Sequence, residues 1–157
     1  LQLMLDCTNL LPWSRWITPV VPSMMTKRFD TRFFVARLPD GQEARHDDHE
    51  ATSGLWVAPR LALERYWQGE VMLAPPQIMS LAHLSRFPTA QAILAEARRR
   101  PPPVIQPEPY QHEGARVVAY PGDERHPTRE RAMPGPTKLI YRNERFEPFD
   151  GFEALFL

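Results

Sequence analysis

The sequence predicts an α/β fold, and three observations carry this prediction. Residues 31–38 alternate between the two faces of a strand, with Phe33 and Val35 on one face and Phe34 on the other. Apolar residues recur at helical spacing in three later stretches, at residues 59–69, 75–86 and 89–100. With 157 residues, of which 43% are hydrophobic, the chain is long enough for one buried core, and its length does not suggest two.

The first predicted strand ends at Pro39-Asp40-Gly41, which is a turn signal. Proline presets φ, aspartate can bond its own backbone, and glycine accepts a positive φ. The apolar segment 55–57, Leu-Trp-Val, is predicted to form a second strand, so that the turn would belong to a hairpin. The connection between the two strands carries acidic and histidine side chains, namely His46, Asp47, Asp48, His49 and Glu50.

The predicted helices have recognisable ends. Pro59 suits the first turn of a helix that Gly69 would stop, with Ala62, Leu63, Tyr66 and Trp67 on its apolar side. Thr89 is a suitable N-cap for the third helix, and the basic run 98–100 falls where a helix C-terminus favours positive charge. This run could contact phosphate, although its position at a helix end before Pro101 favours a solvated cap.

Proline divides the chain unevenly. Ten of the 18 prolines follow residue 100, and three of them are consecutive at 101–103, where they cannot continue a helix. We therefore expect a boundary near residue 100, with one part at residues 1–100 and a Pro-rich C-terminal arm at 101–157. The arm is predicted to contain short strands at 116–120 and 137–141, with a turn at Asn143-Glu144.

The residues from the N-terminus to about position 100 resemble the distal, C-terminal half of a Nudix hydrolase domain. In that family a carboxylate lies six positions before a tryptophan, and a helix with an Ala-Leu pair follows; the matching residues here are Glu50, Trp56, Ala62 and Leu63. A more specific similarity to the branch of coenzyme A and acyl-CoA diphosphatases lies in the segments 16–19 (WITP), 27–34 (KRFDTRFF) and 73–77 (LAPPQ). The resemblance implies an α/β/α sandwich, of which this chain supplies the distal half.

The Nudix signature itself, G-x5-E-x7-R-E-U-x-E-E-x-G-U with U apolar, is absent from the 157 residues. In the family this box precedes the segment seen here and supplies the carboxylates that hold magnesium. We therefore interpret the chain as the distal part of a longer protein or of a truncated reading frame. If an upstream segment supplies the box, the resemblance implies Mg²⁺- or Mn²⁺-dependent hydrolysis of a diphosphate linkage, with CoA or acyl-CoA as substrate.

The candidate site residues are carboxylates and arginines. Asp48 and Glu50 offer the hard oxygen ligands that Mg²⁺ accepts, and the family pattern makes Glu50 the preferred catalytic residue; a solvated loop would have the same composition. Arg28 and Arg32 could hold the pyrophosphate of a substrate, because the guanidinium fork forms paired, charge-assisted hydrogen bonds. A surface pair between Arg28 and Asp30 that only orders the loop explains the pattern equally well.

Composition narrows the range of partners. The 19 basic and 19 acidic residues cancel, so we expect no nucleic acid and no membrane surface as partner. The resemblance implies a small-molecule diphosphate as substrate. The single cysteine cannot form an internal disulfide, which favours the cytoplasm. Signatures of other enzyme classes, such as G-x-S-x-G, C-x-x-C, H-E-x-x-H and a glycine-rich phosphate loop, are absent from the sequence.

A second hypothesis is that the chain is not an enzyme. A truncated Nudix-like domain without its catalytic box could act as a binding or assembly module, with exposed strand edges that pair with another copy or with the missing half. This hypothesis predicts a homo-oligomer that binds little Mg²⁺.

Overall fold

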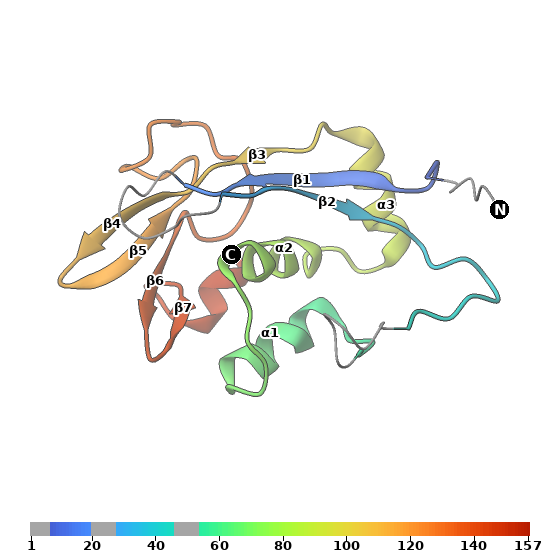
Figure 1. Cartoon of the computed structure of the whole chain (residues 1–157), viewed down its shortest axis with the longest axis horizontal. Coiled ribbons are helices and arrows are strands. Elements are labelled where there is room, and N and C mark those ends of the chain that lie inside the picture. The colour runs from blue at the N-terminus through green and yellow to red at the C-terminus, as the bar shows by residue number, and fades with distance from the viewer. Residues whose placement is uncertain (1–6, 20–27, 46–53) are drawn as a thin grey trace.

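The computed structural model describes residues 7–19, 28–45 and 54–157, and it has the predicted mixed α/β architecture (Figure 1). The elements follow in the order β1 (Leu11–Ile17), β2 (Asp30–Val35), α1 (Pro59–Trp67), α2 (Pro75–Leu84), α3 (Ala90–Arg99), β3 (Val104–Ile105), β4 (Glu108–His112), β5 (Ala115–Ala119), β6 (Lys138–Arg142), β7 (Arg145–Glu147) and the 3₁₀ helix η1 (Phe152–Phe156).

The first sheet has the strand order β2-β1-β3. β1 pairs with β2 antiparallel and with β3 parallel, and an irregularity between Pro12 and Ser14 shifts the β1–β2 register. The predicted strand at 31–38 is confirmed as β2, with Phe33 packed against the core and Phe34 50% exposed on the other face. Its partner β1 places Trp13 and Trp16 in the core, as expected for large aromatics at strand spacing.

The second sheet is an antiparallel meander in the order β4-β5-β6-β7. The predicted turn at Asn143-Glu144 is confirmed, since both residues have positive φ, 52° and 59°, and join β6 to β7 in a two-residue hairpin. The predicted strands at 116–120 and 137–141 correspond to β5 and β6. β4 contains Pro109, which the sheet accepts because β4 is an edge strand.

All three predicted helices are present. α1 begins at Pro59, buries Ala62, Leu63 and Tyr66, and is followed by Gly69 with φ 80°. The Thr89 hydroxyl caps α3 by accepting a hydrogen bond from the Ala92 N–H at 3.1 Å. No helix in the described part of the chain combines the length and the apolar character that crossing a membrane requires.

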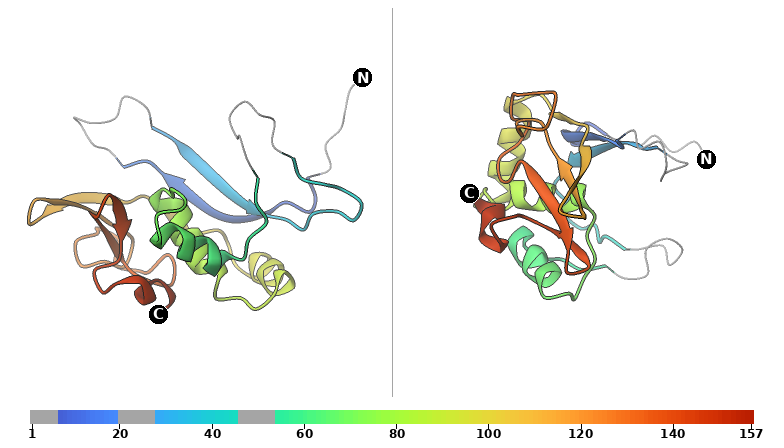
Figure 2. Two further views of the ribbon diagram at one scale, coloured as in Figure 1. Left: turned by 90° about the horizontal axis from the view of Figure 1, so that it is seen from below. Right: turned by 90° about the vertical axis from the view of Figure 1, so that its left-hand side faces the viewer.

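One hydrophobic core joins the helices to both sheets. The two views of Figure 2 place α1, α2 and α3 to one side of β1 and β2. The core cluster includes Leu63 and Ile78 from the helices, but also Ile105, Tyr120 and Leu139 from beyond residue 100. Residues 101–157 therefore pack into the same core as the preceding helices rather than extending away as an arm, because their strands present apolar side chains between the prolines.

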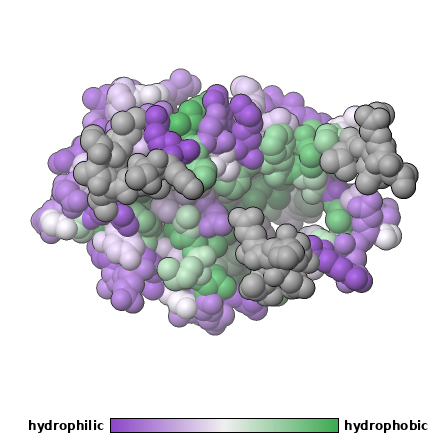
Figure 3. Space-filling view, in the orientation of Figure 1, coloured by the Kyte–Doolittle hydropathy of each residue, from purple (hydrophilic) through white to green (hydrophobic). Residues whose placement is uncertain are grey.

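The predicted hairpin is wrong in one respect. The turn forms, with the Gln42 N–H donating to the Pro39 carbonyl at 3.2 Å and Gly41 at φ 78°, but residues 54–58 form no strand. An apolar segment becomes a strand only beside a partner, and none of the described strands lies next to it. Leu55 and Trp56 are 61% and 75% exposed as a result. Figure 3 shows hydrophobic residues gathered along β1 and β2 and over α1.

Candidate functional site

Arg28 lies at the junction of β1 and β2. Its Nε and Nη2 atoms donate to the Thr18 carbonyl at 3.2 and 3.1 Å. The Thr18 hydroxyl in turn accepts a hydrogen bond from the Phe29 N–H at 2.9 Å. Arg28 therefore orders the ends of the two strands, and two of its guanidinium nitrogens already have an acceptor.

The alternative interpretation, a surface pair between Arg28 and Asp30, is wrong, because Asp30 is bound by Arg15. Arg15 donates from Nε and Nη2 to the two carboxylate oxygens of Asp30, at 2.8 and 2.6 Å. The hydrogen bond from Arg15 lowers the pKa of Asp30, and the same bond raises the pKa of Arg15. The paired geometry is possible because Arg15 faces Arg32, and Asp30 lies two positions from Arg32 on the same face of the antiparallel β1–β2 ladder.

Arg32 lies opposite Arg15 in the register of β1 and β2. It is exposed, and within the described ranges its guanidinium has no hydrogen-bond acceptor. Arg15, Asp30 and Arg32 therefore form a small polar group on the face of the first sheet that the core does not cover. The structure does not bring Arg28 into this group, because its guanidinium is held at Thr18.

The two predicted acidic residues, Asp48 and Glu50, lie outside the described residues. Among residues 7–19, 28–45 and 54–157, no group of three or more histidine, cysteine, aspartate or glutamate side chains could hold a metal ion. The described residues therefore do not fit a divalent cation.

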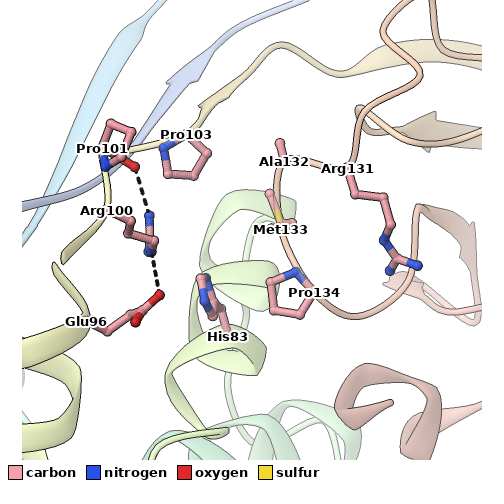
Figure 4. Close-up of a pocket in the computed structure, with 9 residues that line it drawn as sticks. All are labelled: His83, Glu96, Arg100, Pro101, Pro103, Arg131, Ala132, Met133 and Pro134. Atoms are coloured by element: carbon pink, nitrogen blue, oxygen red, sulfur yellow. Dashed lines mark hydrogen bonds and ion pairs between the residues drawn. The ribbon is translucent and has the colours of Figure 1, made fainter.

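A cavity of about 410 Å³ opens between α2, the C-terminal end of α3 and the segment 131–134. Its walls are formed by His83, Glu96, Arg100, Pro101, Pro103, Arg131, Ala132, Met133 and Pro134. Figure 4 shows His83, Glu96 and Arg100 on one side of the cavity and Met133 and Pro134 on the other, while the side chain of Arg131 points away.

Arg100 is the residue of this cavity that sequence reasoning missed. Arg98 and Arg99 are exposed, as a solvated cap predicts, but the Arg100 side chain is only 18% exposed. Arg100 precedes Pro101, and a residue before proline favours extended backbone; its φ of −123° and ψ of 149° turn it out of the helix. The Arg-Pro junction was the signal that separated this arginine from its neighbours.

His83 lies beside Arg100 in an aromatic environment. Its ring centroid is 4.7 Å from that of Trp13 and 5.9 Å from that of Phe87. Burial and then the charge of Arg100 lower the pKa of His83 to about 4. The imidazole is therefore neutral at neutral pH, and it can donate one hydrogen bond and accept another.

Comparison with known proteins identifies the family. The mixed α/β fold is the class expected of a Nudix domain. The model of the NUDT19 Nudix domain matches residues 1–84, more than half of the chain, and the chain therefore belongs to this Nudix family. The search of solved structures gave no significant match.

Three of the curated relatives share one name. The chain is 38% identical over 79 residues to acyl-coenzyme A diphosphatase NUDT19 of Xenopus laevis, an alignment of 50% of this chain and 21% of the frog protein. It is 36% identical over 87 residues to the Homo sapiens protein of that name, covering 53% of this chain and 23% of the human protein. The Gallus gallus protein is 36% identical over 84 residues, with 52% and 22% covered. The chain thus spans less than a quarter of the length of these relatives.

Proposed function

We propose that this chain is the distal part of a Nudix hydrolase that cleaves the diphosphate linkage of CoA or acyl-CoA when an upstream segment carrying the Nudix box completes it. The observation that carries the proposal is the family match over residues 1–84, together with relatives named as acyl-CoA diphosphatases. A small-molecule diphosphate is accordingly the proposed ligand, and a cytoplasmic location remains part of the proposal.

Within this proposal the arginines of β2 and its entrance hold the substrate. Arg32 is the better candidate, because it is exposed and carries no acceptor among the described residues, so its fork is free for a pyrophosphate. Arg28 would contribute mainly by keeping the β1–β2 junction in place, since Nε and Nη2 donate to Thr18. Glu50 is the proposed catalytic carboxylate, and Asp48 and Glu50 are the proposed metal ligands of this chain.

The Mg²⁺ or Mn²⁺ requirement belongs to the proposal as well. Because the described residues offer no ligand group for such an ion, the principal ligands are assigned to the Nudix box outside residues 1–157.

The test is hydrolysis of CoA and acetyl-CoA with Mg²⁺ or Mn²⁺, with 3′,5′-ADP detected by mass spectrometry, on this chain and on a form extended upstream. We expect turnover only in the extended form, and a fall of about 100-fold or more in Glu50→Gln, in line with the loss of a general base. Glu43→Gln is the matched control, because Glu43 is an exposed carboxylate paired only with Arg45 among the described residues. Absence of activity in both forms would refute the proposal.

A second candidate function is an assembly module without catalysis. The exposed Leu55 and Trp56 favour it, as does the outer edge of β2, which has no partner strand among the described residues, because exposed apolar segments and strand edges bind other chains. This function predicts a concentration-dependent homo-oligomer by light scattering, and a Trp56→Ser variant that shifts toward monomer. A monomeric chain that hydrolyses CoA would contradict it.

A further inference from the structure

The guanidinium of Arg100 is fixed in position but only partly satisfied. It stacks on the Trp13 ring, with Cζ 4.4 Å from the ring centroid, and Nη1 donates to the Trp13 carbonyl at 3.2 Å. Among the described residues, Nε and Nη2 have no hydrogen-bond acceptor, although Nε is 3.4 Å from a carboxylate oxygen of Glu96. Buried donors without acceptors are costly, especially on a charged group.

Glu96 does not fully neutralise the charge of Arg100, because its carboxylate also binds Arg99. Both of its carboxylate oxygens accept hydrogen bonds from the neighbouring Arg99, at 2.8 to 2.9 Å. Burial lowers the pKa of Arg100, which is the direction expected of a cation that is short of counter-charge.

The charges around the cavity favour an anion. Arg100 and the carboxylate Glu96 lie at the cavity, where Glu96 is already bound by Arg99, while the Arg131 side chain points away. His83 adds no positive charge at neutral pH, but its ring can serve as a hydrogen-bond donor. The local excess of positive charge contrasts with the formal net charge of zero for the whole chain.

The rest of the cavity wall is apolar. Pro101, Pro103, Ala132, Met133 and Pro134 surround the polar groups, and Figure 4 shows Met133 and Pro134 opposite Arg100. A cavity of about 410 Å³ lies within the size range of small-molecule sites. An arginine fork on one side of an apolar cavity suits a ligand with an anionic end and a non-polar body.

We propose that the cavity between α2, the end of α3 and residues 131–134 binds a small oxyanion, a carboxylate or a phosphate, through Arg100, with the apolar walls holding the non-polar part of the ligand. The Trp13 ring and carbonyl hold the guanidinium ready, so that little side-chain freedom is lost on binding. This inference does not depend on the proposed hydrolase function, and its residues lie apart from Arg28, Arg32 and Glu50 in the sequence.

The binding experiment uses the 157-residue chain and three probes: inorganic phosphate, acetate and octanoate. Affinity is measured by nuclear magnetic resonance titration of backbone amides at pH 7. We expect saturable shifts in the amides around Arg100 and Met133. Octanoate binding tighter than acetate assigns a carboxylate with an apolar body, and tighter phosphate binding assigns a phosphate. No saturable shift with any probe up to millimolar concentrations would overturn the proposal.

Two nearby arginines provide a matched pair of variants. Arg100→Gln should weaken the best probe at least tenfold, the order expected for a lost charge-assisted hydrogen bond. Arg98→Gln removes the same charge two residues away, from an exposed side chain, and should change affinity less than threefold. Equal weakening by both variants would show a general charge effect and would overturn the assignment to Arg100.

A further readout uses the unmodified protein, in case Arg100→Gln does not fold. An anion in the cavity lies beside His83, which also faces Glu96 of α3, Arg100 at the end of α3 and Arg86 just after α2. Bound octanoate or phosphate should therefore raise the pKa of His83 from its value of about 4, as measured on its ring protons. An unchanged His83 titration at saturating probe would also overturn the proposal.

Discussion

The two buried tyrosines should respond in opposite directions to the same substitution, Tyr→Phe. Tyr66 is 3% exposed and Tyr120 is 1% exposed, so the loss of either hydroxyl changes little surface. The Tyr66 hydroxyl donates to the Phe146 carbonyl and accepts from the Phe146 N–H, both at 2.9 Å. The Tyr120 hydroxyl has no hydrogen-bond partner among the described residues.

The magnitude for Tyr66 follows from the position of Phe146. β7 is an edge strand, and Phe146 faces Tyr141 across a non-bonded pair of the β6–β7 ladder, so its N–H and carbonyl point away from β6. Tyr66→Phe therefore leaves two partly buried backbone groups without partners. At roughly 1 to 2 kcal/mol for each group, the variant should lose about 2 to 4 kcal/mol of unfolding free energy.

For Tyr120 the expected sign is reversed. Its hydroxyl is taken out of water on folding without gaining a bond, which costs about 1 kcal/mol or more. Tyr120→Phe removes this cost, so it should leave the unfolding free energy unchanged or increase it by about 1 kcal/mol. Burial raises the pKa of both tyrosines, so both hydroxyls stay protonated at neutral pH.

The assay is urea unfolding followed by circular dichroism, with Tyr141→Phe as control. Tyr141 is 40% exposed and its hydroxyl has no hydrogen bond within the described part of the chain, so this variant should stay within about 0.5 kcal/mol of the wild type. A Tyr66→Phe variant as stable as the control would refute the reasoning, and so would a Tyr120→Phe variant that loses more than about 1 kcal/mol.

Two further predictions concern a tight turn and a pH effect. Gly122→Ala should lower the unfolding free energy by about 3 kcal/mol, because φ is 101° and an added Cβ would lie 2.5 Å from Cγ and 3.0 Å from Cα of Arg131. The control Gly114→Ala, at φ 81° with open space around it, should lose only about 1 kcal/mol. Equal losses of the two variants in urea unfolding would contradict the steric argument. The pKa of His83 falls from 6.5 to about 4 on folding, because burial favours the neutral imidazole. The contribution of His83 to the unfolding free energy is therefore fully present above pH 6.5 and is lost as pH falls toward 4. After allowance for solvent screening, the wild type should lose about 1 to 2 kcal/mol more than His83→Gln between pH 7 and pH 4.5, and parallel pH profiles would contradict this.

The helices could be predicted from the sequence because their signals are local. Pro59 in the first turn, the Thr89 cap and the stop at Gly69 each act within a few residues, and the structure confirms all three. The Asn143-Glu144 turn is also a local signal, because a two-residue hairpin depends on the conformation of the turn residues themselves.

Strand pairing could not be predicted in the same way, because it depends on segments that are distant in sequence. The turn signal at Pro39-Asp40-Gly41 is correct, but β2 pairs with β1 and not with a strand after the turn. Leu55 to Val57 has strand-forming residues without a neighbouring strand in the described part of the chain. A short apolar run is a strand only in a sheet that accepts it.

The proline-rich region shows how composition can mislead about packing. Proline excludes the middle of a helix, and α3 ends at Arg99, shortly before the three consecutive prolines. Proline does not exclude packing: Pro109 lies in the edge strand β4, and Pro148 is fully buried directly after β7. Proline content therefore predicted where the helix stops, whereas the buried side chains of Val118 and Leu139 join the later strands to the core.

The same property of proline accounts for the cavity. Three consecutive arginines at a helix C-terminus predict one solvated group, because all three have the same side chain and the same position relative to the helix dipole. Only Arg100 stands before a proline, and only Arg100 takes an extended backbone that directs its guanidinium over Trp13. Which ring it would meet depends on the β1–α3 packing, and that contact spans 87 residues of sequence. The placement of each side chain in a basic run is therefore better predicted separately, with the backbone restriction at its position considered before its charge.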